Sequence, residues 1–213
     1  MKPTPGRRKL LTVLGLLPAG LLPAGLLAST TASADTTRQT ASAAAGPFYP
    51  TPSMRFPDID NDLVKIESRV REAGGEILQL SGQVTTVAGE PLPGVRIEIW
   101  QCDVNGRYLH TKDNNSATAD PDFQGFGFTV SDEAGRYAFR TIKPVSYPGR
   151  TPHIHVKLLH GDTELITQLY LKDHPQNERD GLYRRMSAAE RATVDMTVVE
   201  QGDVLMTEIN LVV

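Results

Sequence analysis

Two tyrosines and a closely spaced pair of histidines are the residues of this chain whose types and spacing suggest metal chemistry. Tyr108 follows Asn105-Gly106-Arg107, and Tyr147 lies shortly before His153-Ile154-His155. A tyrosine phenolate is a hard, anionic ligand that suits Fe(III), whereas imidazole alone would serve zinc, copper or nickel equally well. Together the four side chains indicate one ferric iron site.

The spacing of His153 and His155 places both imidazoles on one face of a strand. Residues i and i+2 of a strand point to the same side, with α-carbons roughly 6.5–7 Å apart. Both rings can therefore reach one metal while Ile154 packs into the opposite layer. An isolated pair of this kind is more often a polar strand face satisfied by backbone or water, and a lone tyrosine is usually an ordinary half-buried residue. Only the combination of all four points to a metal.

Short strands separated by turns that contain glycine and proline make up most of the chain after residue 75. The strand pattern occurs at residues 78–84, 95–99, 126–130, 137–142, 153–160, 164–172 and 204–213. Residues 131–135 and 161–162 each predict a hairpin connection between the strands that they separate. Ser187 and Glu190 form a capping box for one short helix that ends near Val194. The pattern predicts an all-β fold, an antiparallel sandwich or barrel with long loops and one short C-terminal helix.

The first 34 residues predict an export signal that is cleaved from the mature protein. Arg7-Arg8-Lys9 precede an apolar stretch from Leu10 to Ala28, and Ala32-Ser33-Ala34 is a small-residue cleavage site. Two prolines interrupt the stretch and disfavour a membrane-spanning helix. The paired arginines before Leu10-Leu11 resemble a twin-arginine signal, which directs the export of folded proteins. The alternative is a plain signal whose basic residues happen to be adjacent.

The mature chain is expected to begin with a flexible tether at residues 35–45, which are small and polar without an apolar pattern. The ordered domain is expected at residues 46–213, starting where Phe48 and Tyr49 need a surface to pack against. We expect a bacterial protein that is secreted, periplasmic or held at the cell surface, with no membrane span in the mature chain.

Charge and cysteine content exclude further classes of function. Signal removal takes away four of the 22 basic residues and no acidic residue, so 18 bases face 25 acids and the net charge is −7. An acidic surface disfavours nucleic acid or an anionic membrane as a partner. The single cysteine, Cys102, excludes an intrachain disulfide, and we expect it to be a buried hydrophobe within a strand.

The order of these residues resembles that of the intradiol ring-cleavage dioxygenases, the non-haem ferric enzymes typified by protocatechuate 3,4-dioxygenase. The resemblance extends from Gly46 to about Tyr183. Its strongest segments are residues 99–101, Asn105-Gly106-Arg107-Tyr108, residues 139–144, Tyr147, Arg150, His153-Ile154-His155 and residues 168–171. An antiparallel β-sandwich of the transthyretin (prealbumin) type is the expected fold.

The resemblance implies roles for individual residues. The implied ligands of one Fe(III) per chain are Tyr108, Tyr147, His153 and His155. It also implies that Tyr147 leaves the metal when a catechol binds, that Arg150 lies beside the ring carbon attacked by O2, and that Gln168 lies near Arg150. The alternatives are a solvated loop arginine and a solvent-facing amide. Trp100 and Tyr170 match pocket-lining positions, although core packing would explain them equally well.

The implied reaction is cleavage of a catechol ring by O2 between its two hydroxyl-bearing carbons, which gives a cis,cis-muconate-type diacid. A small-molecule catechol and O2 are therefore the expected partners, and a homo-oligomer is left open. One alternative is a transthyretin-like sandwich that binds without catalysis, which would not need the tyrosine pair with His-x-His. Another is a zinc or copper site, which would want an activating glutamate or a third spaced histidine. His110, His160 and His174 match no ligand position and are expected at the surface.

The chain departs from the family pattern in two places. Tyr147 and His153 are six positions apart, which is shorter than expected in enzymes for catechol or protocatechuate, and this loop shapes the pocket mouth. The mature chain also lacks the helical N-terminal segment through which catechol and hydroxyquinol enzymes dimerise. We therefore expect a more open pocket and a catechol met outside the cytoplasm, such as one from plant or lignin breakdown.

Overall fold

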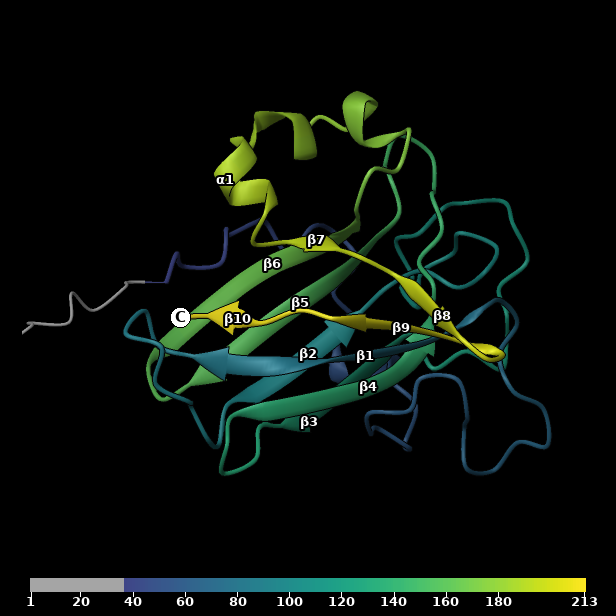
Figure 1. The fold of residues 1–213 in the computed structure, drawn as a ribbon. Helices are drawn as coiled ribbons and strands as arrows, with labels where there is room; N and C mark the ends of the chain where they lie inside the picture. The colour runs from purple at the N-terminus through teal and green to yellow at the C-terminus, as the bar shows by residue number, and fades with distance from the viewer. Residues whose placement is uncertain (1–36) are drawn as a thin grey trace, which may run out of the picture. The chain divides into compact units, whose positions relative to one another are not determined.

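The computed structural model describes residues 37–213, so the predicted export signal lies outside the described residues. This part of the chain is mostly β-sheet with very little helix, and its strands form two mixed sheets (Figure 1). No helix within it is long and apolar enough to cross a membrane. The all-β prediction is therefore confirmed, whereas the prediction of purely antiparallel sheets is wrong, because each sheet also contains strands that pair in parallel.

The first sheet is built around one long strand, β1 (Ile77–Thr85). β1 pairs antiparallel with β4 (Arg136–Ile142) along one side, and parallel with β9 (Val204–Glu208) and β10 (Leu211–Val212) along the other. β8 (Val199–Gln201) extends the sheet beyond β9. Alternate residues of β1 are buried, as expected when one face covers a core.

The predicted strand at residues 204–213 is split into β9 and β10, and Gly82 of β1 lies against the backbone between them. A Cβ on Gly82 would lie 1.9 Å from the carbonyl oxygen of Ile209. The same carbonyl accepts a hydrogen bond of 2.8 Å from the Tyr137 hydroxyl. A side chain at position 82 would force these segments apart.

The second sheet carries His153 and His155, two of the four candidate metal ligands. Its strand order is β3 (Phe126–Val130), β2 (Arg96–Trp100), β5 (His153–His160), β6 (Thr163–Leu171) and β7 (Asp195–Met196). β5 and β6 form the predicted hairpin around residues 161–162. The register places His153 opposite Tyr170, and His155 opposite both Gln168 and Trp100.

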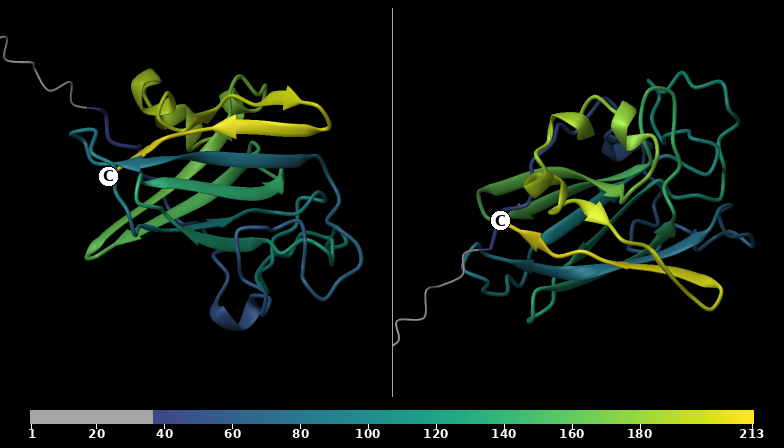
Figure 2. Two further views of the ribbon diagram at one scale, coloured as in Figure 1. Left: turned by 60° about the horizontal axis from the view of Figure 1, so that its bottom comes forward. Right: turned by 45° about the horizontal axis from the view of Figure 1, so that its top comes forward.

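The two sheets share one hydrophobic core. It contains residues of β1 and β4 from one sheet and of β2, β5 and β6 from the other, and Figure 2 shows the sheets as two layers. The predicted hairpin at residues 131–135 is wrong, because β3 pairs with β2 whereas β4 pairs with β1. The turn instead carries the chain from one sheet to the other, so each strand can bury its apolar face against the shared core.

Short helices connect β6 to β7. They are η2 (Asn177–Arg179), η3 (Tyr183–Arg185) and α1 (Ala188–Arg191), and a further turn, η1 (Pro52–Met54), lies near the N-terminus. The predicted capping box is present, since the Ser187 hydroxyl accepts from the backbone of Glu190 and the Glu190 carboxylate accepts from the backbone of Ser187. The helix ends at Arg191, which is earlier than predicted.

Residues 37–45, which composition favours as a tether, make specific contacts with the folded sheets. The backbone of Ala43 donates to Ile166 of β6 at 2.7 Å, and that of Thr40 donates to Val212 of β10 at 3.0 Å. Thr40 is buried. Small side chains give no periodic signal, but they let a backbone approach a sheet closely, which is what these contacts require.

Candidate metal centre

β5 begins with the two histidines, and their ring nitrogens face each other. The Nε2 atoms of His153 and His155 are 3.2 Å apart, while Ile154 is fully buried in the shared core on the opposite face. The Nδ1–H of His153 donates to the carbonyl of Thr151 at 2.7 Å. That bond leaves the lone pair on Nε2, which is the tautomer that a metal ligand needs.

A tight turn places Tyr147 beside Arg150. The backbone N–H of Arg150 donates to the carbonyl of Tyr147 at 3.0 Å, and Gly149 between them has φ +82°. Pro148 followed by a left-handed glycine is the signature of a type II turn. The turn brings Nη1 of Arg150 to 3.3 Å from the Tyr147 hydroxyl.

Tyr108 lies on a loop whose backbone donates hydrogen bonds to two aspartates. The Asp103 carboxylate accepts from the backbone N–H groups of Asn105 and Arg107, and Asp113 accepts from that of Tyr108 at 2.6 Å. The Tyr108 ring is buried and stacks on Phe48 at a centroid distance of 4.9 Å. Its hydroxyl lies 3.5 Å from Nε2 of His153.

The structure thus brings together all four predicted ligands. The Tyr147 ring lies 5.3 Å from that of Tyr108 and 5.5 Å from that of His153. No group of three or more His, Cys, Asp and Glu side chains within residues 37–213 could hold a metal. The phenol oxygens of Tyr108 and Tyr147 are the further potential ligands that lie beside the two histidines.

Burial sets the protonation of the four groups in the metal-free protein. It raises the pKa of Tyr108 well above its ordinary value and also raises the pKa of Tyr147, although the Arg150 charge opposes the second shift. It lowers the pKa of His153 to about 4 and that of His155 well below 6.5. Neutral imidazoles and two phenols that become phenolates fit Fe(III), because the phenolates offset most of the charge buried with the metal.

We expect the affinity of this site for Fe(III) to rise steeply with pH. Each phenol must lose a proton on binding while the imidazoles are already neutral, so above pH 6 the affinity should rise about 100-fold per pH unit. Competition with a chelator of known affinity at each pH would measure this slope. Tyr147→Phe should halve the logarithmic slope, and an affinity that does not depend on pH would contradict the expectation.

Arg150 contacts three different groups through its three nitrogens. Nε donates to Asp180 at 2.8 Å, Nη1 to the Tyr147 hydroxyl and Nη2 to Oε1 of Gln168. Its side chain is 18% exposed, so it is not a freely solvated loop arginine. Gln168 is buried, and its amide also donates to the carbonyl of Ala44. It is therefore not a solvent-facing amide.

Trp100 and Tyr170 lie behind the histidines. Trp100 is fully buried and stacks on the His155 ring, with centroids 4.7 Å apart and planes 9° apart. The Tyr170 ring is buried 5.8 Å from His153, and its hydroxyl donates to Gln168. Both therefore pack as core residues that support the face carrying the ligands.

The other sequence predictions have mixed outcomes. Cys102 is buried, and burial raises its pKa to about 12, but it lies beyond the end of β2 and not within a strand. His160 is exposed, whereas His110 and His174 are half-buried. Sequence reasoning did not find Phe48 as the stacking partner of Tyr108, nor Asp180 as the partner of Arg150. Asp180 sits among charged residues of an irregular segment, where no periodicity distinguishes it.

A cavity of about 410 Å³ opens beside Tyr147. Its lining includes Tyr147, Pro148, Gly149, Arg150, Gln176 and Arg179. A Cβ built on Gly149 would meet no atom within 4 Å. Gly149 therefore faces open space at the edge of this cavity.

Comparison with known proteins gives matches to dioxygenases. Residues 45–209 match the family model described as Dioxygenase. The chain is 34% identical over 168 residues to the protocatechuate 3,4-dioxygenase beta chain of Burkholderia cepacia, covering 72% of this chain and 71% of that protein. It is 29% identical over 182 residues to catechol 1,2-dioxygenase of Candida albicans, covering 72% of this chain and 54% of that enzyme. The chain thus spans little more than half of the catechol enzyme.

The fold is also similar to solved structures of dioxygenases. The dioxygenase domain of a dioxygenase–carbohydrate-binding fusion protein from Streptomyces sp. SirexAA-E matches with a TM-score of 0.63 and 30% identity, covering 83% of this chain and 98% of that one. An intradiol ring-cleavage dioxygenase from Tetranychus urticae matches with a TM-score of 0.64 and 23% identity, covering 83% and 94%.

Proposed function

Because the chain belongs to the intradiol ring-cleavage dioxygenases, we propose that it holds one ferric ion and uses O2 to cleave a catechol ring between the two hydroxyl-bearing carbons. The proposed ligands are Tyr108, Tyr147, His153 and His155. The observation that carries the proposal is the convergence of two phenols and two neutral imidazoles in one buried cluster. We also infer a sandwich of the transthyretin type, which the core shared by the two sheets supports.

The residues of the cluster and the arginine beside it would have separate roles in the reaction. Tyr108, Tyr147, His153 and His155 would hold the ferric ion, which would supply the Lewis acidity that makes a bound catechol reactive toward O2. Tyr147 is the more exposed phenol and would accept one catechol proton at its oxygen. Arg150, whose Nη1 lies beside that oxygen, would stabilise negative charge as it develops on the attacked carbon. Both atoms of O2 end in the carboxyl groups of the diacid.

Oxygen uptake with a panel of catechols, together with identification of the ring-opened product, would test this function. The iron-loaded protein should also be burgundy, because charge transfer from tyrosinate to Fe(III) absorbs visible light. A colourless protein with one iron per chain would contradict the ligand set. Binding of catechols without oxygen uptake would favour the non-catalytic binding module instead.

We propose that the natural substrate is a catechol with a bulky substituent, met outside the cytoplasm. The cavity beside Tyr147 and Arg150 supports this proposal, because a substituent on the ring could extend into it. The basic, apolar and small-residue pattern of residues 1–34 supports export, with twin-arginine export favoured by Arg7-Arg8. N-terminal sequencing of the exported protein would test cleavage before Asp35.

Gly149→Trp should narrow the range of substrates. The indole would extend into the cavity mouth and should lower kcat/KM for bulky catechols at least tenfold relative to that for catechol itself. Gly149→Ala is the matched control, because both variants bear the same left-handed backbone cost of about 1–2 kcal/mol. Steady-state kinetics on catechols of increasing size would measure the effect. The same ratio of rates in both variants would contradict a substrate that extends past Gly149.

A further inference from the structure

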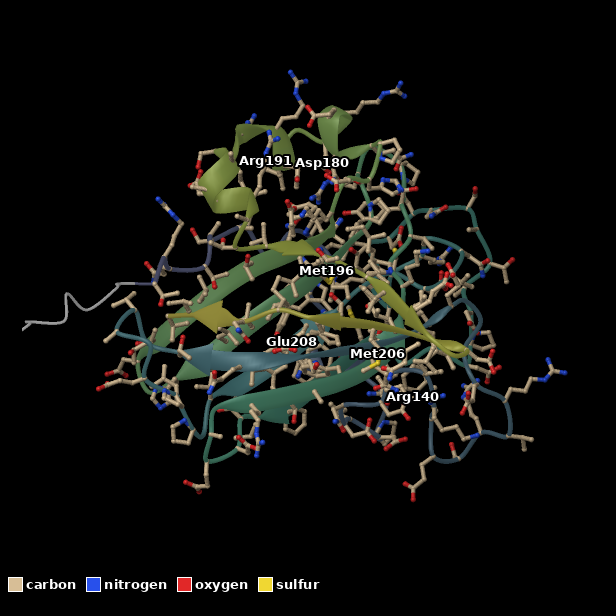
Figure 3. The ribbon with its side chains drawn as sticks, viewed as in Figure 1. Arg140, Asp180, Arg191, Met196, Met206 and Glu208 are labelled. Atoms are coloured by element: carbon tan, nitrogen blue, oxygen red, sulfur yellow. The ribbon has the colours of Figure 1, made fainter. Side chains whose placement is uncertain are left out.

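Asp180 is a buried carboxylate outside the proposed ligand set, and it contacts Arg150. The side chain of Asp180 has no exposed surface, and the residue lies between η2 and η3, where Figure 3 labels it. Its Oδ2 accepts from Nε of Arg150 at 2.8 Å and from the backbone of Thr151 at 3.1 Å. Its Oδ1 accepts from the backbone N–H groups of Leu182 and Tyr183. We propose that Asp180 is a positioning residue that fixes the Arg150 guanidinium for the step in which O2 attacks the ring.

The charge state of Asp180 agrees with this role. Burial alone would raise its pKa, but hydrogen bonds from Tyr183, Arg150 and Thr151, with the charge of Arg150, hold the pKa below its ordinary value. A buried ion pair adds little net stability even when its hydrogen bonds are complete. Four donors satisfy this carboxylate, so its main consequence is a fixed geometry.

Asp180 and Gln168 hold the guanidinium through atoms that need not move during the reaction. Of the three partners of Arg150, only Tyr147 is expected to leave its position when a catechol binds. The bonds to Nε and Nη2 then define the plane of the guanidinium without Tyr147. Planar guanidinium groups held through two edges lose little freedom and keep a fixed direction.

The same segment also holds the backbone next to the histidines. The Thr151 hydroxyl donates to Asn177 at 2.7 Å, and the Thr151 carbonyl accepts from Nδ1 of His153. The Asp180 carboxylate accepts a hydrogen bond from the backbone N–H of Thr151. The segment after β6 therefore orients Arg150 directly and His153 through one residue.

Asp180→Asn should disrupt one of the two pairs of hydrogen bonds that the Asp180 carboxylate accepts, either the pair from Arg150 and Thr151 or the pair from Leu182 and Tyr183. The asparagine side chain has one acceptor oxygen and one amide nitrogen, so it cannot accept from both pairs of donors. If the oxygen stays with Leu182 and Tyr183, Arg150 faces an N–H group in place of its acceptor. Asp195→Asn is the matched control, because Asp195 accepts from the Tyr183 hydroxyl in the same region and has no bond to Arg150.

This inference rests on the proposed function, and the experiment tests the two separately. With a turned-over catechol, Asp180→Asn should lower kcat roughly 10- to 100-fold, leave the catechol KM within about threefold and keep the iron absorption. In an Arg150→Ala background, the same substitution should change kcat less than about threefold, because both residues act through one group. A full effect in that background, or the same loss in Asp195→Asn, would overturn the proposal.

Exchange of the Arg150 Nε–H with solvent, followed by NMR, gives a readout that does not depend on activity. It should be slow in the wild-type protein and at least tenfold faster in Asp180→Asn. Unchanged protection would overturn the positioning role even if kcat fell. If the wild-type protein consumed no O2 with any catechol, the proposed function would fail, while this measurement would still decide whether Asp180 fixes Arg150.

Discussion

Tyr108→Phe should remove the iron and lower ring cleavage more than a hundredfold while leaving the fold intact. The substitution deletes only the phenol oxygen, and the ring that stacks on Phe48 stays. Loss of a partner that merely orients a metal ligand costs 10–100-fold in metal affinity or activity, so loss of a ligand should cost more. Iron content after gel filtration, visible absorption and oxygen uptake would measure the result.

Tyr137→Phe is the matched control for this experiment. Tyr137 is also a buried tyrosine, but its hydroxyl donates to the carbonyl of Ile209 in the first sheet. Its loss should cost about 1–3 kcal/mol of stability, because the carbonyl is left without that donor, and should spare iron and activity. Tyr108→Phe should instead keep the stability and lose the iron and the activity. Full retention of iron and turnover in Tyr108→Phe would exclude it as a ligand.

The part of the site that sequence predicts best is the part with strict periodicity. Strand alternation alone puts His153 and His155 on one face with Ile154 in the core, and the structure has that arrangement. The type II turn at Tyr147 is also local, since proline and glycine determine it, although no turn was predicted there. Each of these features depends on a few consecutive residues, so no knowledge of the rest of the chain is needed.

The contacts that sequence missed all join distant segments. Gln168 lies 124 residues from Ala44, whose carbonyl holds its amide, and Arg150 lies 30 residues from Asp180. The pairing of β3 with β2, in place of β4, likewise depends on which faces the whole chain must bury. Local turn signals give no information about partners of this kind, because tertiary burial decides them.

Arg150→Lys should lower kcat by roughly 10²–10³ while iron, colour and catechol binding are kept. Lysine retains the positive charge, but its single ammonium group cannot keep the bonds to Asp180, Gln168 and Tyr147 at once. A preformed complex of enzyme and catechol, mixed with O2 in a single turnover, would measure the affected step apart from binding. We expect the slow phase to appear only after O2 is added.

Arg140→Lys is the control for a general loss of a guanidinium. Arg140 pairs with Asp62 and Glu72 on the first sheet, and Figure 3 shows it far from Asp180. Partly exposed pairs of this kind contribute about 0–1 kcal/mol, so this variant should keep its full rate. If Arg150→Lys also kept its rate, charge alone would suffice at this position. The planar contacts with Asp180 and Gln168 would then have no part in the reaction with O2.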